Sequence, residues 1–317
     1  NALIDMYVKC GMLVKAQEVL QELSFRDIGS WNTLLAGYVH QGKSQELLNC
    51  FHQIHQEGLC PDVVTFLCML KACSVTGTLQ KGKQIHEEIL SRGLLKKEIV
   101  LGNALLDMYT KCGSLERAQR LAEELPIRNI ISWSTLIAGY AQWGQASAAL
   151  SCFAQMQSEG VYPDAVTFIS SLKACGHIRA IDKGKEIHDE IVKSSLLEKD
   201  IVLGSALVDM YVKCGDLAKA RQVLKKLPIQ NIVAWSTVIS GYAQQGKGHE
   251  AVKCFEQMQD EGLSPNAITF ICILHACSDA GALDKGKQTH EQIMNSCLLE
   301  TNIVLGNALV DMYAKCS

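Results

Sequence analysis

Several features that mark common classes of protein are scarce in this sequence. Aromatic residues make up 6% of the 317 residues and only 5 are proline, although 48% are hydrophobic, a composition typical of helical, repetitive proteins. Lysine and arginine number 30 against 33 aspartates and glutamates, so the formal net charge of -3 shows no basic excess that would indicate a nucleic-acid partner. No apolar run approaches the roughly eighteen residues of a membrane span, so we expect no membrane contact.

Cys-x-x-Cys pairs are absent as well, which argues against zinc-ribbon and deaminase-type metal sites. Fourteen cysteines are present, and four of them lie 102 residues apart: Cys10, Cys112, Cys214 and Cys316. Equivalent cysteines in successive structural copies lie too far apart for a disulfide, which needs α-carbons within roughly 7 Å. We therefore expect buried, reduced cysteines and neither a metal nor a cofactor.

The same 102-residue period runs through the whole sequence and relates Trp31, Trp133 and Trp235. Each period divides into units of 35, 36 and 31 residues. The predicted units of this single array are 1–27 (partial), 28–62, 63–98, 99–129, 130–164, 165–200, 201–231, 232–266, 267–302 and 303–317 (partial). Because the pattern is interrupted at both ends of the sequence, we expect a segment of a longer protein.

Each unit has the pattern of a helical hairpin, with two apolar stripes separated by a glycine turn. In the unit 28–62 the stripes on either side of Gly42 are Trp31, Leu34, Leu35 and Tyr38, then Leu47, Phe51 and Ile54. A hairpin of this size cannot bury both stripes alone, so neighbouring hairpins must stack. We predict an all-α solenoid, a right-handed superhelix whose groove is lined by the first helices.

Three phrases carry a family resemblance: Trp31 to Leu34, Leu70 to Cys73, and Asn103 to Gly113. Together with the ordered lengths 35, 36 and 31, they resemble plant pentatricopeptide repeat proteins of the PLS subclass, whose P, L and S units have these lengths. The resemblance implies that the chain binds single-stranded RNA in a chloroplast or mitochondrion, as the target-recognition segment of a C-to-U RNA editing or RNA-processing factor. It also implies that catalysis, where present, belongs to a C-terminal cytidine deaminase outside this segment, which is itself no enzyme.

Family members read one base per repeat with the fifth and the last residue of each unit, along an RNA that runs parallel to the chain. In the P units these pairs are Asn32 with Asp62, Ser134 with Asp164, and Ser236 with Asn266. In the S units they are Asn1 with Asp27, Asn103 with Asn129, and Ser205 with Asn231. In the L units the fifth residue is apolar: Leu67, Ile169 or Ile271.

The chemistry of these residue types predicts a base for each pair. An ionised aspartate can only accept, which suits the ring N–H of uracil and guanine, whereas an asparagine amide can donate to the ring acceptor of adenine and cytosine. Asparagine at the fifth position favours the smaller pyrimidine, and serine leaves room for a purine. The predicted site is 5′-U-U-N-C-G-N-A-A-N-3′, where N marks the L units.

Two further sets of residues follow from the resemblance. Apolar second residues would clamp the bases from either side: Val64, Val100, Ile131, Val166, Val202 and Val233. One lysine in each S unit would meet phosphates: Lys9, Lys111, Lys213 and Lys315. Gly29 departs from the clamp pattern. The L units would be free to bind helper proteins, the multiple organellar RNA editing factors.

Structural interpretations compete with these. An asparagine or serine near a helix start is often a cap, and a lysine near the C-terminal end of a helix stabilises the helix by interacting with its dipole. A tetratricopeptide-like scaffold for protein partners would share the hairpins, but it would keep one unit length near 34 residues.

The Ser134→Asn change tests the predicted code. It lengthens the fifth residue beside an unchanged aspartate, so the preferred fifth base should move from G to U by about 1 to 3 kcal/mol. Binding to RNA probes that differ only at that base measures the change. A preference that stays with G would show that the register or the strand direction is wrong.

Overall fold

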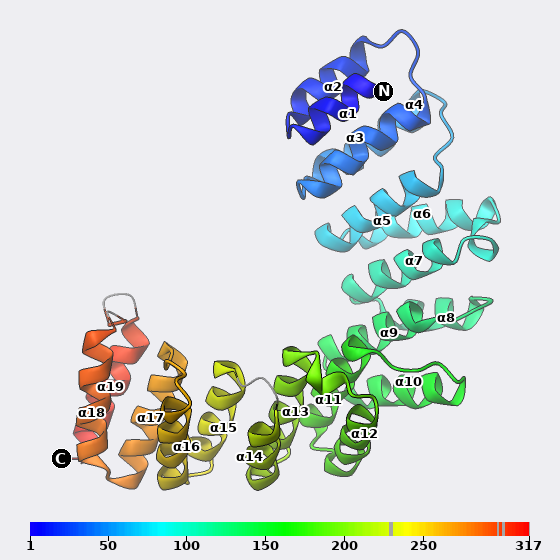
Figure 1. Cartoon of the computed structure of the whole chain (residues 1–317). Helices are drawn as coiled ribbons and strands as arrows, with labels where there is room; N and C mark the ends of the chain where they lie inside the picture. The colour runs from blue at the N-terminus through cyan, green and yellow to red at the C-terminus, as the bar shows by residue number, and fades with distance from the viewer. Residues whose placement is uncertain (228–230, 297, 300–301, 317) are drawn as a thin grey trace. The chain divides into compact units, whose positions relative to one another are not determined.

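The computed structural model describes residues 1–227, 231–296, 298–299 and 302–316. In these residues every regular element is helical, and the helices α1 to α19 follow one another along the chain (Figure 1). None of them is long and apolar enough to cross a membrane. The prediction of an all-α helical solenoid is confirmed.

The odd-numbered helices are the first helices of the repeats: α1 (Ala2–Lys9), α3 (Ile28–His40), α5 (Val63–Thr76), α7 (Ile99–Lys111), α9 (Ile130–Gln142), α11 (Ala165–Ile178), α13 (Ile201–Lys213), α15 (Ile232–Gln244), α17 (Ala267–Ala280) and α19 (Ile303–Cys316). The even-numbered helices are the second helices: α2 (Leu13–Glu22), α4 (Ser44–Gln56), α6 (Leu79–Ser91), α8 (Leu115–Glu124), α10 (Ala146–Ser158), α12 (Ile181–Lys193), α14 (Leu217–Lys226), α16 (Gly248–Asp260) and α18 (Leu283–Asn295). Short 3-10 helices follow α6 and α12: η1 (Leu94–Lys96) and η2 (Leu196–Glu198).

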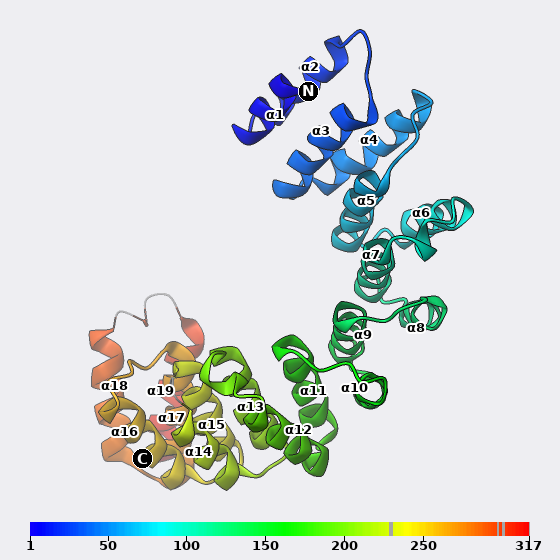
Figure 2. The same ribbon diagram turned by 45° about the vertical axis from the view of Figure 1, so that its right-hand side comes forward.

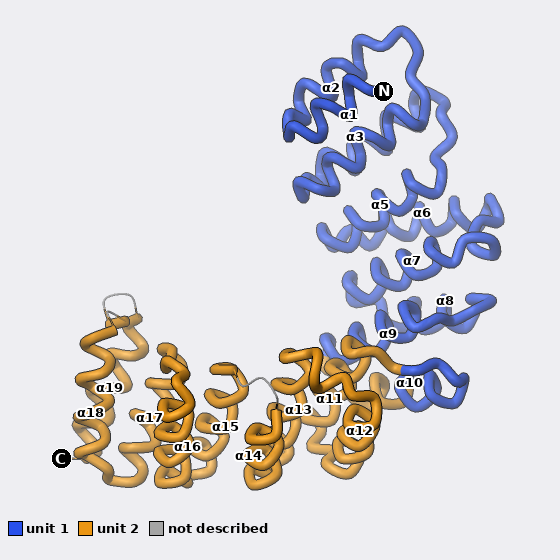
Figure 3. The backbone as a smooth tube through the Cα atoms, in the orientation of Figure 1, with its two compact units in different colours: residues 1–143, 152–162 blue, residues 144–151, 163–317 orange. Residues whose placement is uncertain are grey.

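The chain forms two compact units, which are described separately (Figure 3). Unit 1 comprises residues 1–143 and 152–162, and unit 2 comprises residues 144–151 and 163–317. Within each unit the first helices pack against one another in chain order, as α3, α5 and α7 do in unit 1 and α13, α15 and α17 do in unit 2 (Figure 2). Second helices such as α4 and α16 pack against their own first helices, so each unit is a stack of hairpins.

The predicted apolar stripes form the core of the stack. All seven members in the hairpin α3–α4 are buried: Trp31, Leu34, Leu35, Tyr38, Leu47, Phe51 and Ile54. Full burial of one such side chain contributes about 1.5 to 3 kcal/mol. The core therefore lies between hairpins as well as inside them, which is why the single hairpin is not the folding unit.

The cysteines related by the 102-residue period differ from the expectation of burial. Cys10 is exposed and the other three are half-buried. Each of these three thiols lies near the backbone carbonyl of a buried cysteine in the preceding L unit, as Cys112 Sγ does at 3.6 Å from the Cys73 oxygen. They sit at the ends of first helices, where the thiol donates weakly to a carbonyl that also accepts from backbone N–H groups of its own helix end, as the Cys73 oxygen does from Thr78.

Glycine is required where a P unit packs on the S unit before it. A Cβ atom on Gly139 of α9 would lie 2.7 Å from both Thr110 Cβ and Thr110 Cγ2 of α7. The equivalent glycines, Gly37 and Gly241, meet side chains just as closely. The first helices approach at these points because no side chain separates them.

Gly139→Ala should lower the free energy of unfolding by about 1 to 3 kcal/mol, the usual cost of overpacking a stiff site. Gly29→Ala is the matched control, because a Cβ there meets nothing closer than Asp27 Oδ1 at 3.5 Å. Urea titrations followed by circular dichroism compare the two variants with the parent. Equal midpoints for the parent and Gly139→Ala would contradict the close approach of α7 and α9.

Candidate nucleic-acid interface

The last residue of every P and S unit directly precedes the first helix of the next unit and caps it. Each side chain accepts a hydrogen bond from the backbone N–H three residues later, at 2.7 to 3.0 Å. The capping residues are Asp27, Asp62, Asn129, Asp164, Asn231 and Asn266. The capping interpretation, which concerns asparagine and serine, is therefore confirmed for Asn129, Asn231 and Asn266, and the three aspartates cap in the same way. A base-reading role must coexist with the cap.

Fifth and last residues meet in three of the predicted pairs. Asn32 Nδ2 lies 2.9 Å from both carboxylate oxygens of Asp62. In the next S unit, Asn103 Nδ2 donates to Asn129 Oδ1 at 3.4 Å. In these pairs, the pairing implied by the family resemblance corresponds to side chains in contact.

In unit 2 the last residue donates instead. Asn231 Nδ2 donates to Ser205 Oγ at 2.9 Å, because the serine side chain has no amide and its hydroxyl donates to the Ile201 carbonyl at 3.0 Å. Ser134 and Asp164 belong to different compact units. Ser134 Oγ donates to the Ile131 carbonyl at 3.2 Å, and Asp164 caps α11.

A buried hydroxyl at the third position of the following unit links many of these pairs. Thr65 Oγ1 lies 2.7 Å from Asn32 Oδ1 and 3.0 Å from Asp62 Oδ1. Thr269 Oγ1 lies 2.7 Å from Ser236 Oγ and 2.9 Å from Asn266 Oδ1. The buried hydroxyl therefore holds the fifth and the last side chain in place by lying within hydrogen-bond distance of both.

These hydroxyls were not predicted, although the sequence carries a signal for them. A serine or threonine stands three residues after five of the six last positions: Ser30, Thr65, Ser132, Thr167 and Thr269. All five are buried. Ser30 Oγ joins Asn1 and Asp27, and Ser132 Oγ joins Asn103 and Asn129. Ala234 takes the remaining position, where the last and fifth residues bond directly.

The Asp62 carboxylate is held in its ionised form. Partial burial would raise its pKa, but hydrogen bonds from the Thr65 N–H, the Asn32 amide and the Thr65 hydroxyl outweigh that effect and lower the pKa below its ordinary value. The pKa of Asp27 is also lowered, mainly by the hydroxyl and the backbone N–H of Ser30. At neutral pH both carboxylates are therefore ionised, and they can accept hydrogen bonds but cannot donate them.

All six predicted clamp residues are exposed, by 48 to 63% of their surface: Val64, Val100, Ile131, Val166, Val202 and Val233. The structure adds Ile268 and Val304, exposed by 63% and 61% at the same position of their units. The 102-residue period would have found both, since it relates them to Val64 and Val100. At Gly29 the neighbouring atoms leave space for a side chain.

A hollow of about 330 Å³ in unit 2 brings these sets together. We call it the base hollow; it is lined by the fifth residue Ser236, the last residue Asn266 and the second residues Val233 and Ile268. Lys213 lies on its other side, from α13. Ser236, Asn266 and Val233, which the family resemblance implies to read or to clamp a base, therefore line one cavity.

Each of the four predicted phosphate lysines bonds to an aspartate one turn earlier, at 2.7 to 2.8 Å. The pairs are Lys9 with Asp5, Lys111 with Asp107, Lys213 with Asp209, and Lys315 with Asp311. Such exposed pairs add little stability. The aspartates offset the charge of the lysines, and the phosphate contacts stay a prediction.

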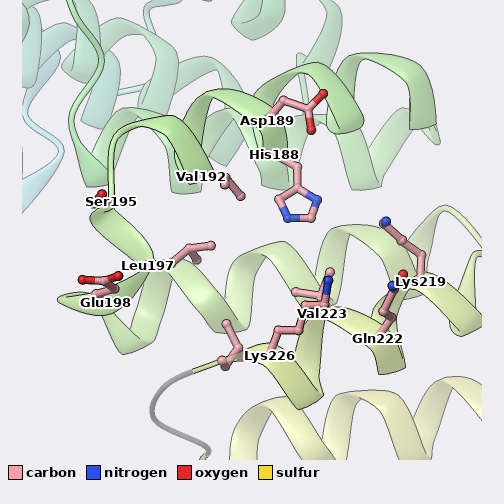
Figure 4. A pocket seen from close by; sticks show the side chains of 11 residues that line it. His188, Asp189, Val192, Ser195, Leu197, Glu198, Lys219, Gln222, Val223 and Lys226 are labelled. Atoms are coloured by element: carbon pink, nitrogen blue, oxygen red, sulfur yellow. The ribbon is translucent and has the colours of Figure 1, made fainter.

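A second hollow, of about 480 Å³, lies between second helices of unit 2 (Figure 4). His188 and Val192 of α12 lie on one side, and Lys219 and Lys226 of α14 lie on the other. His188 Nδ1 bonds Tyr211 Oη at 2.8 Å, and burial lowers the pKa of the histidine. No cluster of three metal-ligating side chains occurs among the residues that the structure describes.

Asn32→Ala should raise the pKa of Asp62 towards its ordinary value, because the variant loses a hydrogen bond to the ionised form. Carboxyl carbon chemical shifts, followed by NMR as the pH is lowered, measure both values. In the parent, the stability that Asp62 contributes is present above the unfolded-state pKa and is lost as the pH falls through the lower folded-state pKa. An unchanged Asp62 titration in Asn32→Ala would show that the amide does not bond the carboxylate in solution.

Comparisons with known proteins follow the repeat pattern. The model of the PPR repeat family matches residues 26–75, 128–177 and 230–279, and a PPR repeat model matches residues 1–28, 64–94 and 205–232. The maize pentatricopeptide repeat protein PPR10, crystallised with an 18-nt psaJ RNA element, has a similar structure, with a TM-score of 0.78 and 20% identity. The match covers 99% of this chain and 47% of PPR10 and shows the shared fold.

Curated relatives come from Arabidopsis thaliana. Pentatricopeptide repeat-containing protein At5g27110 is 34% identical over the whole chain, the mitochondrial protein At3g09040 is 36% identical over 99% of it, and the chloroplastic protein At4g18520 is 32% identical over all of it. The chain spans 45%, 30% and 51% of the lengths of these three proteins. With its repeat period, stacked hairpins and family matches, the chain belongs to the plant pentatricopeptide repeat (PPR) family.

Proposed function

We propose that the chain binds single-stranded RNA, one base per P or S unit, as the target-recognition segment of an organellar C-to-U RNA editing or RNA-processing factor of the PLS subclass. The RNA complex of PPR10 supports RNA as the ligand class, and the mitochondrial and chloroplastic relatives support an organelle as its place of action. The ordered unit lengths support the PLS assignment.

The base hollow is the observation that carries this proposal. The exposed apolar side chains of Val233 and Ile268 in its lining suit the two faces of a base. Ser236 and Asn266 are the fifth and last residues in this lining, and the other polar residues that line the hollow are Asp209, Lys213, Thr237, Ser240 and Gln244. The Asn266 Oδ1 atom is engaged by the Thr269 N–H and hydroxyl, so its amide nitrogen is the group left to donate. A donor beside a short serine selects adenine, which has a ring acceptor and the larger ring system.

The same reasoning extends along the chain. In unit 1, Oδ1 of Asp62 takes the capping bonds while Oδ2 can accept from the ring N–H of uracil. Asn1 with Asp27 selects U, and Asn103 with Asn129 selects C. Read in chain order, the pairs give the site 5′-U-U-N-C-G-N-A-A-N-3′.

L units serve a different purpose in this proposal. Their apolar fifth residues cannot read a base edge, so these units bind helper proteins, the multiple organellar RNA editing factors. The hollow between α12 and α14 is lined in part by second-helix residues of the L unit 165–200, which supports a role for this unit in binding a helper protein. A scaffold that binds only proteins is the competing function, and a chain that binds helpers without RNA would favour it.

Asn266→Asp tests the proposed readout. The change replaces a donor by an acceptor, so the preferred eighth base should move from A to G by about 1 to 3 kcal/mol. Fluorescence anisotropy with RNA probes that differ only at that base measures it at one fixed salt concentration.

Asn302→Asp is the matched control. Asn302 also caps a first helix, since its Oδ1 accepts from the Leu305 N–H at 3.1 Å, but it closes an L unit whose fifth residue is Ile271. This control should leave all base preferences unchanged. Retention of A by Asn266→Asp, or an equal change in both variants, would rule out the proposed code.

A further inference from the structure

A third hollow, of about 540 Å³, lies where the first helices α11, α13 and α15 end in unit 2. We call it the turn hollow; Arg179, His177 and Gln245 line it, and no acidic side chain does. It shares Val212, Lys213, Gly241 and Gln244 with the base hollow, so the two hollows are neighbours along α13 and α15. A strand whose base enters the base hollow has its backbone next to the turn hollow.

The turn that lines this hollow differs from the same turn in the other two L units. Residues 176–179 read Gly-His-Ile-Arg, whereas residues 74–77 read Ser-Val-Thr-Gly and residues 278–281 read Ser-Asp-Ala-Gly. The missing side chain at Gly176 lets the Lys213 stem approach, since a Cβ there would lie 3.1 Å from Lys213 Cδ. Compared with the same turn in the other two L units, this turn therefore has both more space, at Gly176, and an added positive charge, at Arg179.

Arg179 occupies a backbone conformation that favours glycine. Its φ is 55°, in the left-handed region, where the equivalent residues Gly77 and Gly281 have φ of 69° and 61°. An arginine is strained there, whereas glycine adopts this conformation without cost. Helix capping alone therefore favours glycine at position 179, and the arginine needs another explanation.

The charge of Arg179 is available to a ligand. The side chain is exposed, and among the residues that the structure describes no carboxylate lies within ion-pair distance of it. Lys213, in contrast, is paired with Asp209 at 2.8 Å. A guanidinium beside amide and imidazole groups matches a phosphate, because its N–H groups fit two phosphate oxygens at once.

We propose that the turn hollow binds an RNA phosphate beside the seventh nucleotide of the proposed site, with Arg179 as the residue that contacts it. This inference rests on the proposed RNA binding and adds a backbone contact that only the second L unit can make. Arg179 belongs to the unit of the sixth nucleotide and Lys213 to the unit of the seventh. These two units assign the phosphate contact to the linkages beside the seventh nucleotide.

Arg179→Gly separates phosphate binding from a structural role of the arginine. A structural role predicts that the variant loses stability, whereas phosphate binding predicts that it loses RNA affinity without losing stability. Relief of the backbone strain should keep or raise the melting temperature. Loss of one phosphate contact should weaken binding of the 5′-U-U-N-C-G-N-A-A-N-3′ RNA about fivefold near 0.1 M salt and reduce the salt slope by about 0.7. Arg179→Lys, which keeps a charge, should retain part of the affinity.

Ser195→Gly is the matched control. Ser195 is the other non-glycine residue of the described chain with positive φ, at 53°, and Gly93 takes its place in the first L unit. It lines the hollow of Figure 4 and lies outside the turn hollow. The control should gain stability in the same way and leave RNA affinity and salt slope unchanged.

A modified probe localises the contact. Neutral methylphosphonates at the two linkages flanking the seventh nucleotide should abolish the difference between the parent and Arg179→Gly, and the same change around the second nucleotide should preserve it. A parent that binds RNA with the same affinity and salt slope as Arg179→Gly overturns the inference, as does a difference that persists on the first probe. A parent that binds no RNA overturns the proposed function instead.

Discussion

The hydrogen bond from the last side chain of one unit to the start of the next helix is the interaction on which this structure depends. It satisfies a backbone N–H that the helix cannot satisfy itself, and it holds the polar side chain at the edge of the first-helix layer. Because only one oxygen is used for the cap, the other polar atom can bond a neighbouring side chain, as Asp62 Oδ2 does with Asn32 and Asn231 Nδ2 does with Ser205. In the proposed readout, folding and recognition therefore use the same residues, and a substitution that changes specificity without losing the cap must preserve that oxygen.

Much of this arrangement could be predicted from the sequence, because it repeats. The apolar stripes and the hairpins follow from spacing, the pairing of Asn32 with Asp62 follows from the family resemblance, and the structure contains them. The hydroxyl of Thr65 was not predicted, since a threonine after a helix start has many ordinary roles and only its two contacts reveal this one. The exposure of Cys10 and the φ of Arg179 depend on backbone position, which spacing does not encode.

Charge is arranged locally in this chain. The formal net charge is -3, and each S-unit lysine is paired with an aspartate, so a general electrostatic attraction to nucleic acid is weak. In the proposed RNA complex, contacts to base edges, exposed apolar side chains and a few unpaired cations then supply most of the binding. Such a surface favours selectivity over affinity, because a base that fits poorly gains little from phosphate contacts made elsewhere.

Selection of bound RNAs from a random pool tests the central claim most directly, because it presupposes neither register nor strand direction. The account predicts a consensus of 5′-U-U-N-C-G-N-A-A-N-3′, with unspecified positions at every third nucleotide where an L unit lies. Enrichment of a sequence in the reverse order, of a consensus without that three-nucleotide rhythm, or of no sequence at all would contradict it.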